Sequence, residues 1–145
     1  MKALASTLLG VSLLSGAGAA TSGERVEYLY RLHCSGCHGM DGAGSKVGRI
    51  PPFAGIVGHF ASSANGRLYL VRVPGLANAA VSDADAARLL NYVLHTWGSA
   101  ELSRDAPDFT SEEVRRLRSV HVDNIAKLRG ELGAELTRHG TSIAY

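Results

Sequence analysis

The sequence predicts a small all-α fold with a C-terminal helical extension. Three observations predict it. Apolar residues recur at intervals of three or four in several segments, two of these segments begin with capping-box patterns, and no segment shows the alternation of a strand. The length of 145 residues allows one domain, or one small domain with an extension. A composition that is 46% hydrophobic and 19% charged is that of a globular protein.

The charges are balanced and dispersed. The chain has 15 Lys and Arg residues against 13 Asp and Glu residues, which gives a net charge of +2. No run of like charges stands out, whereas a nucleic-acid-binding surface needs a concentrated basic patch. We therefore expect no nucleic acid among the partners.

The first segment has the pattern of a secretory signal peptide. Lys2 is the only charged residue before Glu24, and the apolar stretch between them ends in small residues at Ala19 and Ala20. A basic start, an apolar centre and a small-residue cleavage site indicate export to an oxidising compartment. The alternative is an uncleaved membrane anchor, but the many glycines and serines here make a poor spanning helix. We expect cleavage near Ala19/Ala20, which removes residues 1–19 and leaves no stable membrane span.

Residues 20–106 are expected to form the main domain. Its first helix is expected from about Glu24 to His33, where apolar side chains recur at helical spacing. The stretch from about Gly36 to Ala80 is punctuated by glycines and prolines and is expected to be mostly loop. So little regular structure is tolerable if something other than protein fills the core. A further helix is expected after Ser82, which precedes Asp85 in a weak capping-box pattern.

Residues 107–145 are expected to form a helical extension outside the main domain. Thr110 precedes Glu113 in a capping box that opens its first helix. Helical spacing continues beyond it, but Gly130 and Gly133 disfavour a continuous helix, so one long helix and two shorter ones are both compatible with the pattern. The apolar stripe is expected to pack on the main domain, and the alternative is a helix that docks a partner protein.

The strongest chemical signal is Cys34-Ser35-Gly36-Cys37-His38. Its C-x-x-C-H spacing is that of covalent haem attachment, because two thiols three positions apart can each bond one vinyl group of one porphyrin. The histidine that follows can then ligate the iron. A Cys34–Cys37 redox disulfide is an alternative, but no βαβ pattern surrounds it, and a zinc site lacks a second Cys pair. We expect one covalently attached haem c, with Cys34 and Cys37 as the attachment residues and His38 as an iron ligand.

With its surroundings, the motif resembles the class I c-type cytochromes over about residues 23–98. The similar segments are Leu29-Tyr30 before the motif, Met40-Asp41-Gly42 after it, Pro51-Pro52-Phe53-Ala54-Gly55, and the region from Val81 to Val93. The resemblance implies a small cytochrome c-like helical fold around one covalent haem. It also implies that a proline carbonyl accepts a hydrogen bond from the proximal histidine, and that Tyr30 and Tyr92 meet where the first and last core helices cross.

One departure from the family concerns the second axial ligand. The family usually supplies a methionine from the loop before the last core helix, but Val73 to Ala80 holds neither Met nor His. Met40 lies too close to His38 in sequence to reach the opposite face of the ring. We expect His59, in a glycine-rich stretch after the proline segment, to be the distal ligand or a distal hydrogen bonder. The alternative is an empty or water-filled position.

The haem propionates need basic or hydrogen-bonding neighbours. Arg49, just before the proline segment, is one candidate, and Arg67 and Arg72 are the others. The alternative for each is an ordinary surface arginine.

The resemblance implies a periplasmic monohaem electron carrier rather than an enzyme. Its partner would be a redox protein such as a periplasmic dehydrogenase or reductase. The alternative is a haem protein with an open or weakly ligated sixth position, acting as a small-ligand binder, a sensor or a peroxide-reactive site, and the missing methionine favours this alternative. Because the motif, the proline segment and the last core helix all precede Pro107, we expect the extension to be dispensable for haem attachment.

Overall fold

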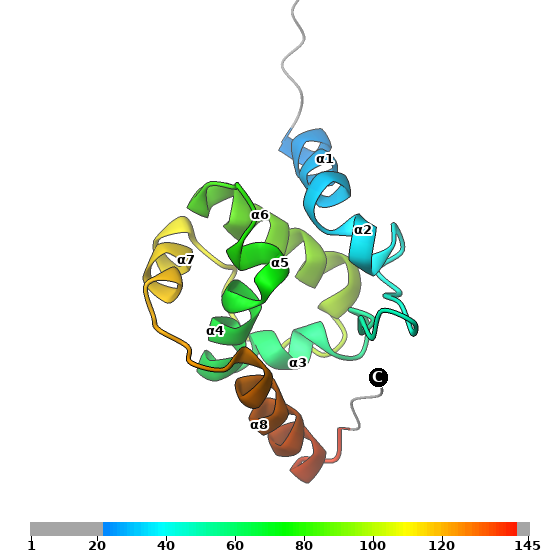
Figure 1. Cartoon of the computed structure of the whole chain (residues 1–145), viewed down its shortest axis with the longest axis vertical. Helices are drawn as coiled ribbons and strands as arrows, with labels where there is room; N and C mark the ends of the chain where they lie inside the picture. Colours follow the sequence, from blue (N-terminus) through cyan, green and yellow to red (C-terminus); the bar gives the residue numbers. More distant parts are fainter. Residues whose placement is uncertain (1–21, 142–145) are drawn as a thin grey trace, which may run out of the picture.

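The structure, a computed structural model, describes residues 22–141, so the predicted signal peptide at residues 1–19 lies outside the described residues. Within this range the fold is all-α, as predicted, apart from one isolated β-bridge between Ser45 and Ile50. No helix in the described part of the chain is long and apolar enough to cross a bilayer. The helices in chain order (Figure 1) are α1 (Ser22–His33), α2 (Ser35–His38), α3 (Val57–Ala61), α4 (Ala64–Arg72), α5 (Pro74–Ala77), α6 (Asp83–Val93), the π-helical turn η1 (Leu94–Gly98), α7 (Ser111–Arg118) and α8 (Ile125–Arg138).

The stretch from Gly36 to Ala80 is more regular than the sequence indicated. It contains α3, α4 and α5, where the glycines and prolines suggested mostly loop. The helix α4 begins with a side-chain cap, because the Gly66 amide donates to Ser63 Oγ at 3.1 Å. A Cβ atom on Gly66 would lie only 2.6 Å from the carbonyl carbon of Phe60. This glycine therefore lets α4 approach α3 closely and does not mark a loop.

The helices α1 and α6 cross through aromatic side chains. The rings of Tyr30 and Tyr92 lie 5.6 Å apart between centroids, which confirms the expected crossing contact. The Tyr30 hydroxyl donates to the Gly39 carbonyl at 2.6 Å, and burial raises the pKa of this phenol to about 12. At the other end of the crossing, Arg25 on α1 pairs with Asp85 on α6 at 3.1 Å. These contacts hold both ends of α1 against the domain, including the end that precedes the cysteine motif.

The predicted N-terminal caps of α6 and α7, Ser82 and Thr110, are both formed. The Asp85 amide donates to Ser82 Oγ at 3.0 Å, and the Glu113 amide donates to Thr110 Oγ1 at 3.1 Å. The extension forms two helices, and the interruption falls at residues 119–124 rather than at the two glycines. Both glycines lie inside α8, whose first turn is held by a cap from Asn124. The cap therefore decides where the second helix starts.

The helix α7 is part of the core. Val114 and Leu117 are buried, and Phe109 just before the helix is buried with them. The Asn91 side chain on α6 binds Phe109 at both backbone groups, since Nδ2 donates to the carbonyl at 3.0 Å and Oδ1 accepts from the amide at 2.8 Å. By contrast, Leu132 is the buried residue of α8. Core contacts thus cross the expected boundary between residues 106 and 107.

Candidate functional site

The cysteine motif occupies a single helical turn. Cys34 lies between α1 and α2, and its amide donates to the Tyr30 carbonyl at 2.9 Å. The His38 amide in turn donates to the Cys34 carbonyl at 3.0 Å, so α2 places Cys37 and His38 on the turn directly after α1. Both cysteines are free thiols, with Cys34 half-buried and Cys37 exposed. The structure therefore brings the predicted attachment residues and the predicted iron ligand together.

The Cys34 thiol does not have the properties of a redox-active cysteine. Burial, with a smaller contribution from Cys37, raises the pKa of Cys34 to about 11. Reactive disulfide pairs depend on a thiolate stabilised near neutral pH. Cys34 stays protonated there, which argues against the redox-disulfide alternative.

The His38 imidazole lies between an aromatic ring and a backbone carbonyl. It stacks on the Phe53 ring with centroids 4.0 Å apart and planes 16° from parallel. Burial lowers the pKa of His38, and the nearby Pro51 carbonyl opposes this shift. Nδ1 is buried and makes no hydrogen bond of full geometry, although that carbonyl lies close enough to act on the ring. The imidazole is therefore neutral at pH 7, which is the form that ligates metals.

A glycine-rich loop brings the proline segment to His38. The Gly44 amide donates to the His38 carbonyl at 2.9 Å, and Gly44 has a φ of +71°. A Cβ atom at this position would lie 2.6 Å from the Pro51 carbonyl oxygen. Only glycine suits this backbone conformation and this close approach, so the loop depends on it.

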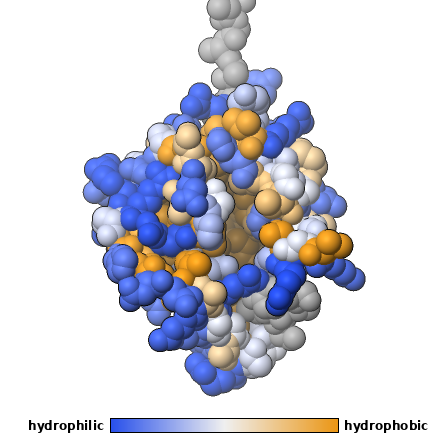
Figure 2. Space-filling model, in the orientation of Figure 1, coloured by the Kyte–Doolittle hydropathy of each residue, from blue (hydrophilic) through white to orange (hydrophobic). Residues whose placement is uncertain are grey.

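A hollow adjoins the motif. Figure 2 shows it near the middle of the drawn face, and in the same orientation α5 lies on one side of it and α2 on the other (Figure 1). Two cysteines within one turn, a neutral imidazole beside the Pro51 carbonyl and a hollow next to them fit a covalently held haem. A haem would also add the apolar mass that so small a domain needs for its core.

Comparison with known proteins identifies the family. A cytochrome c-552 from Thermus thermophilus is 30% identical over 131 residues, which cover 78% of this chain and 86% of that protein. The chain belongs to the c-type cytochromes. A further cytochrome c-552 from the same species is 32% identical over 104 residues, 59% of this chain and 79% of its own length. No protein-family model matches the chain. As a c-type cytochrome, the protein carries covalently bound haem c.

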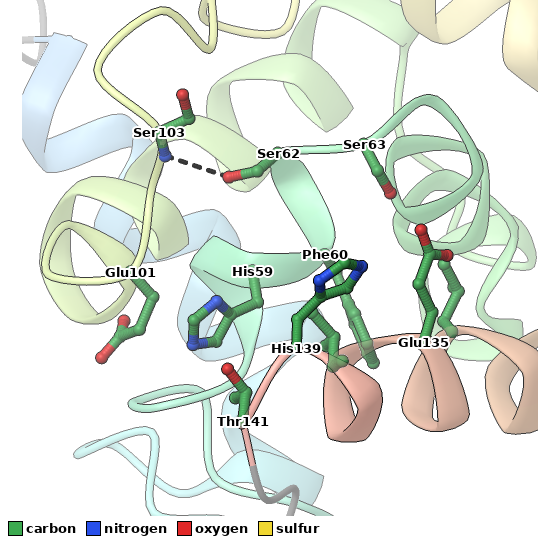
Figure 3. A pocket seen from close by; sticks show the side chains of 11 residues that line it. His59, Phe60, Ser62, Ser63, Glu101, Ser103, Glu135, His139 and Thr141 are labelled. Atoms are coloured by element: carbon green, nitrogen blue, oxygen red, sulfur yellow. Dashed lines mark hydrogen bonds between the residues drawn. The ribbon is translucent and has the colours of Figure 1, made fainter.

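His59 of this cytochrome lines a pocket to which the cysteine motif does not contribute. It lies on α3 and lines a pocket of about 350 Å³. Figure 3 shows His139, after α8, and Glu101, after η1, on the same pocket. Among the described residues, neither the two cysteines nor His38 line it. The assignment of His59 as distal ligand stays a prediction.

The three candidate propionate partners differ in their surroundings. Arg67 forms an ion pair with Glu113 at 2.6 Å, and Arg72 donates to the Arg118 carbonyl at 2.8 Å. Both arginines are thus bound to α7. Arg49 is exposed in the loop before the proline segment, with a φ of 53°. Arg49 is the exposed one of the three, and all three assignments stay predictions.

Sequence reasoning missed the aromatic packing behind His38. The Phe53 ring, which stacks on His38, also lies 5.5 Å from the Trp97 ring. Trp97 lies 5.2 Å from Tyr30 and 5.8 Å from Tyr92, so it joins the crossing of α1 and α6 to the stacked rings of Phe53 and His38. The sequence feature that could have indicated this packing is the spacing of five residues between Tyr92 and Trp97. The π-helical turn η1 brings residues at this spacing onto one face.

Proposed function

We propose that this cytochrome is an exported, periplasmic electron carrier that holds one haem c through thioether bonds from Cys34 and Cys37. His38 is the proposed iron ligand. The partner is a redox protein such as a periplasmic dehydrogenase or reductase, and no substrate bond is made or broken. The observation that carries the proposal is the placement of both thiols and the neutral His38 ring within one turn beside the hollow.

The haem, when bound, supplies the one-electron chemistry, and the chain sets its surroundings. The Pro51 carbonyl can accept a hydrogen bond from the His38 Nδ1–H group, which would fix the ring and raise its basicity toward a metal. The stacked Phe53 ring resists rotation of the imidazole. Burial of the His38 side of the site keeps water away from the proposed iron ligand. A less polar environment favours the ferrous iron, which carries less charge than the ferric iron.

A second candidate function is a haem site with an open or weakly held sixth position. The observation that favours it is the composition of residues 73–80, which hold no methionine and no histidine. Such a site would bind small ligands or react with peroxide.

Attachment is tested by extracting the mature protein with acid and acetone. We expect the haem to stay on the wild-type chain and on Ser35→Ala, a control inside the motif. Cys34→Ala and Cys37→Ala should each lose one thioether bond, which shifts the α-band of the reduced pyridine haemochrome. Extraction of wild-type haem into the organic phase would refute the attachment.

The two functions are separated by the ferric spectrum of the wild type. A low-spin spectrum that is indifferent to added cyanide supports the electron carrier. A high-spin spectrum that changes at low cyanide concentration supports the open site. Reconstitution with a candidate dehydrogenase or reductase then tests electron exchange directly.

A further inference from the structure

The segment from Val73 to Ser82 lies on the opposite side of the hollow from the cysteine motif. It joins α4 to α6 and contains the short helix α5, which borders the hollow in Figures 1 and 2. Leu76 is its buried residue. Val73 and Val81 at its ends are partly buried against the core. A segment with so few buried residues and four residues of helix has little stability of its own, so contacts at its ends contribute to holding it.

Both ends of this segment are bound to one residue, Arg118, at the end of α7. At the first end, Arg72 Nη1 donates to the Arg118 carbonyl at 2.8 Å. At the second end, Arg118 Nη1 donates to the Val81 carbonyl at 3.2 Å and to Asp83 Oδ1 at 2.7 Å. The backbone and the side chain of Arg118 thus join the two ends of a segment that lies far from α7 in the sequence.

These contacts are stronger than those of an ordinary surface pair. The side chains of Arg118 and Asp83 are 23% and 29% exposed, so water screens the charges only in part. Nε and Nη2 of Arg118 are buried without a hydrogen bond to the described residues. The Nη1 contacts to the segment are therefore the hydrogen bonds of this guanidinium, and releasing the segment would leave the cation less satisfied.

The helix that carries Arg118 is itself fixed to the rest of the core. Glu113, earlier on α7, forms two hydrogen bonds with Arg67 on α4. Asn91 on α6 binds the backbone of Phe109. The helix α7 is thus a platform from which Arg118 can hold a less stable segment.

We propose that Arg118 is a positioning residue that closes the segment from Val73 to Ser82 over the haem and limits the access of external ligands to the sixth coordination position. This proposal rests on the proposed haem site. It gives α7 a role in that site, although no residue of α7 belongs to the cysteine motif or to the proline segment.

The test uses the haem-loaded protein and four variants. Arg118→Ala removes the Nη1 contacts, and Arg118→Lys keeps a cation that can reach one of the acceptors. Arg116→Ala is the matched control, because Arg116 is an exposed arginine on the same helix. Leu132→Ala is the control for general destabilisation, because Leu132 is a buried residue of α8 outside the segment. Cyanide binding to the ferric haem and amide hydrogen exchange of residues 74–82 are measured for each.

In Arg118→Ala we expect faster cyanide binding and faster exchange of the segment amides, each by about tenfold, the effect of losing a hydrogen bond to a charged group. Arg118→Lys should recover part of both, and the two controls should resemble the wild type. Equal changes in Arg118→Ala and Leu132→Ala, or unchanged exchange of the segment in Arg118→Ala, would overturn the proposal.

One further variant and the extraction experiment distinguish the possible failures. If Arg118→Ala does not fold, Asp83→Asn removes the ion pair while leaving the arginine, and unchanged exchange and cyanide binding there would refute the role of Arg118. If the haem is not held by the cysteine motif, the extraction experiment reports that failure on its own. The exchange measurement still reads the contact between Arg118 and the segment in that case.

Discussion

Arg67 on α4 and Glu113 on α7 form an ion pair with two hydrogen bonds, 2.7 Å from Nε to Oε1 and 2.6 Å from Nη2 to Oε2. The Arg67 side chain is 10% exposed, and its guanidinium also lies 3.7 Å from the centre of the Phe109 ring. Its Nη1 donates to the Pro107 carbonyl at 3.0 Å. One buried cation therefore holds the start of the extension against the haem-binding domain.

Glu113→Gln should lower the free energy of unfolding by about 3 kcal/mol, because it leaves the buried Arg67 charge without its counterion. Glu112→Gln is the matched control on the same turn. The Glu112 side chain is 79% exposed, and its pair with Arg115 should contribute less than about 1 kcal/mol. Denaturant unfolding of the haem-loaded proteins measures both. Equal stability of the two variants would show that the Arg67 pair contributes nothing beyond a surface contact.

The extension should divide into an essential and a dispensable part. A chain ending after Val122 keeps α7 and loses α8, and we expect it to mature with its haem. A chain ending after Ala106 loses Phe109, Val114 and Glu113, which exposes buried faces of α4 and α6. We expect the shorter chain to accumulate as unstable apoprotein, which denaturing electrophoresis would show as a band that protein stain detects and haem stain does not.

The sequence-based expectation that residues 107–145 are dispensable stays a prediction until these two chains are compared. Maturation of the chain ending after Ala106, with the stability of the longer one, would support that expectation. It would also show that the contacts of Arg67 and Asn91 with the extension are not needed for haem attachment.

Local signals predicted the elements of this fold, and long-range contacts explain what was missed. The caps at Ser82 and Thr110 were visible because each uses residues three positions apart. The surroundings of Arg67 were not visible, because its partner Glu113 lies 46 positions away. The same holds for Gly66, which suggested a loop in the sequence. In the structure it lies inside α4, where its missing side chain makes room for the backbone of α3. For the site, spacing predicted the grouping of Cys34 with the residues that follow it, whereas the surroundings of His59 depend on α8.

The ion pair between Asp85 and Arg25 should make stability depend on pH. The Arg25 side chain, helped by Ser82 and Arg88, holds the pKa of Asp85 below its ordinary value of 3.8. The folded state therefore binds the Asp85 proton less tightly than the unfolded state does. The resulting stabilisation is present above pH 3.8 and is lost as the pH falls through the lowered pKa.

Asp85→Asn should reduce stability at pH 7 by about 1 kcal/mol, because Arg25 and Arg88 are both half exposed and their charges are screened. The difference in unfolding free energy between this variant and the wild type should shrink as the pH falls from 3.8 toward the lowered pKa of Asp85. Thermal unfolding at several pH values measures this. A difference that stays constant down to the acid limit would show that the amide is destabilising for a reason other than charge.

The last prediction concerns His59 and the sixth coordination position. Ligation by His59 would predict a low-spin wild type whose His59→Ala variant becomes high-spin and binds CO readily when reduced. The structure instead places His59 on the pocket that it shares with His139 (Figure 3). That environment favours a His59→Ala variant with the wild-type spectrum. His139→Ala is the matched control, because it removes the other imidazole of the same pocket. Optical spectra of both variants in the ferric and ferrous states decide between the two outcomes: a change confined to His59→Ala assigns the ligand, whereas two unchanged spectra place the sixth ligand, or a vacant position, elsewhere.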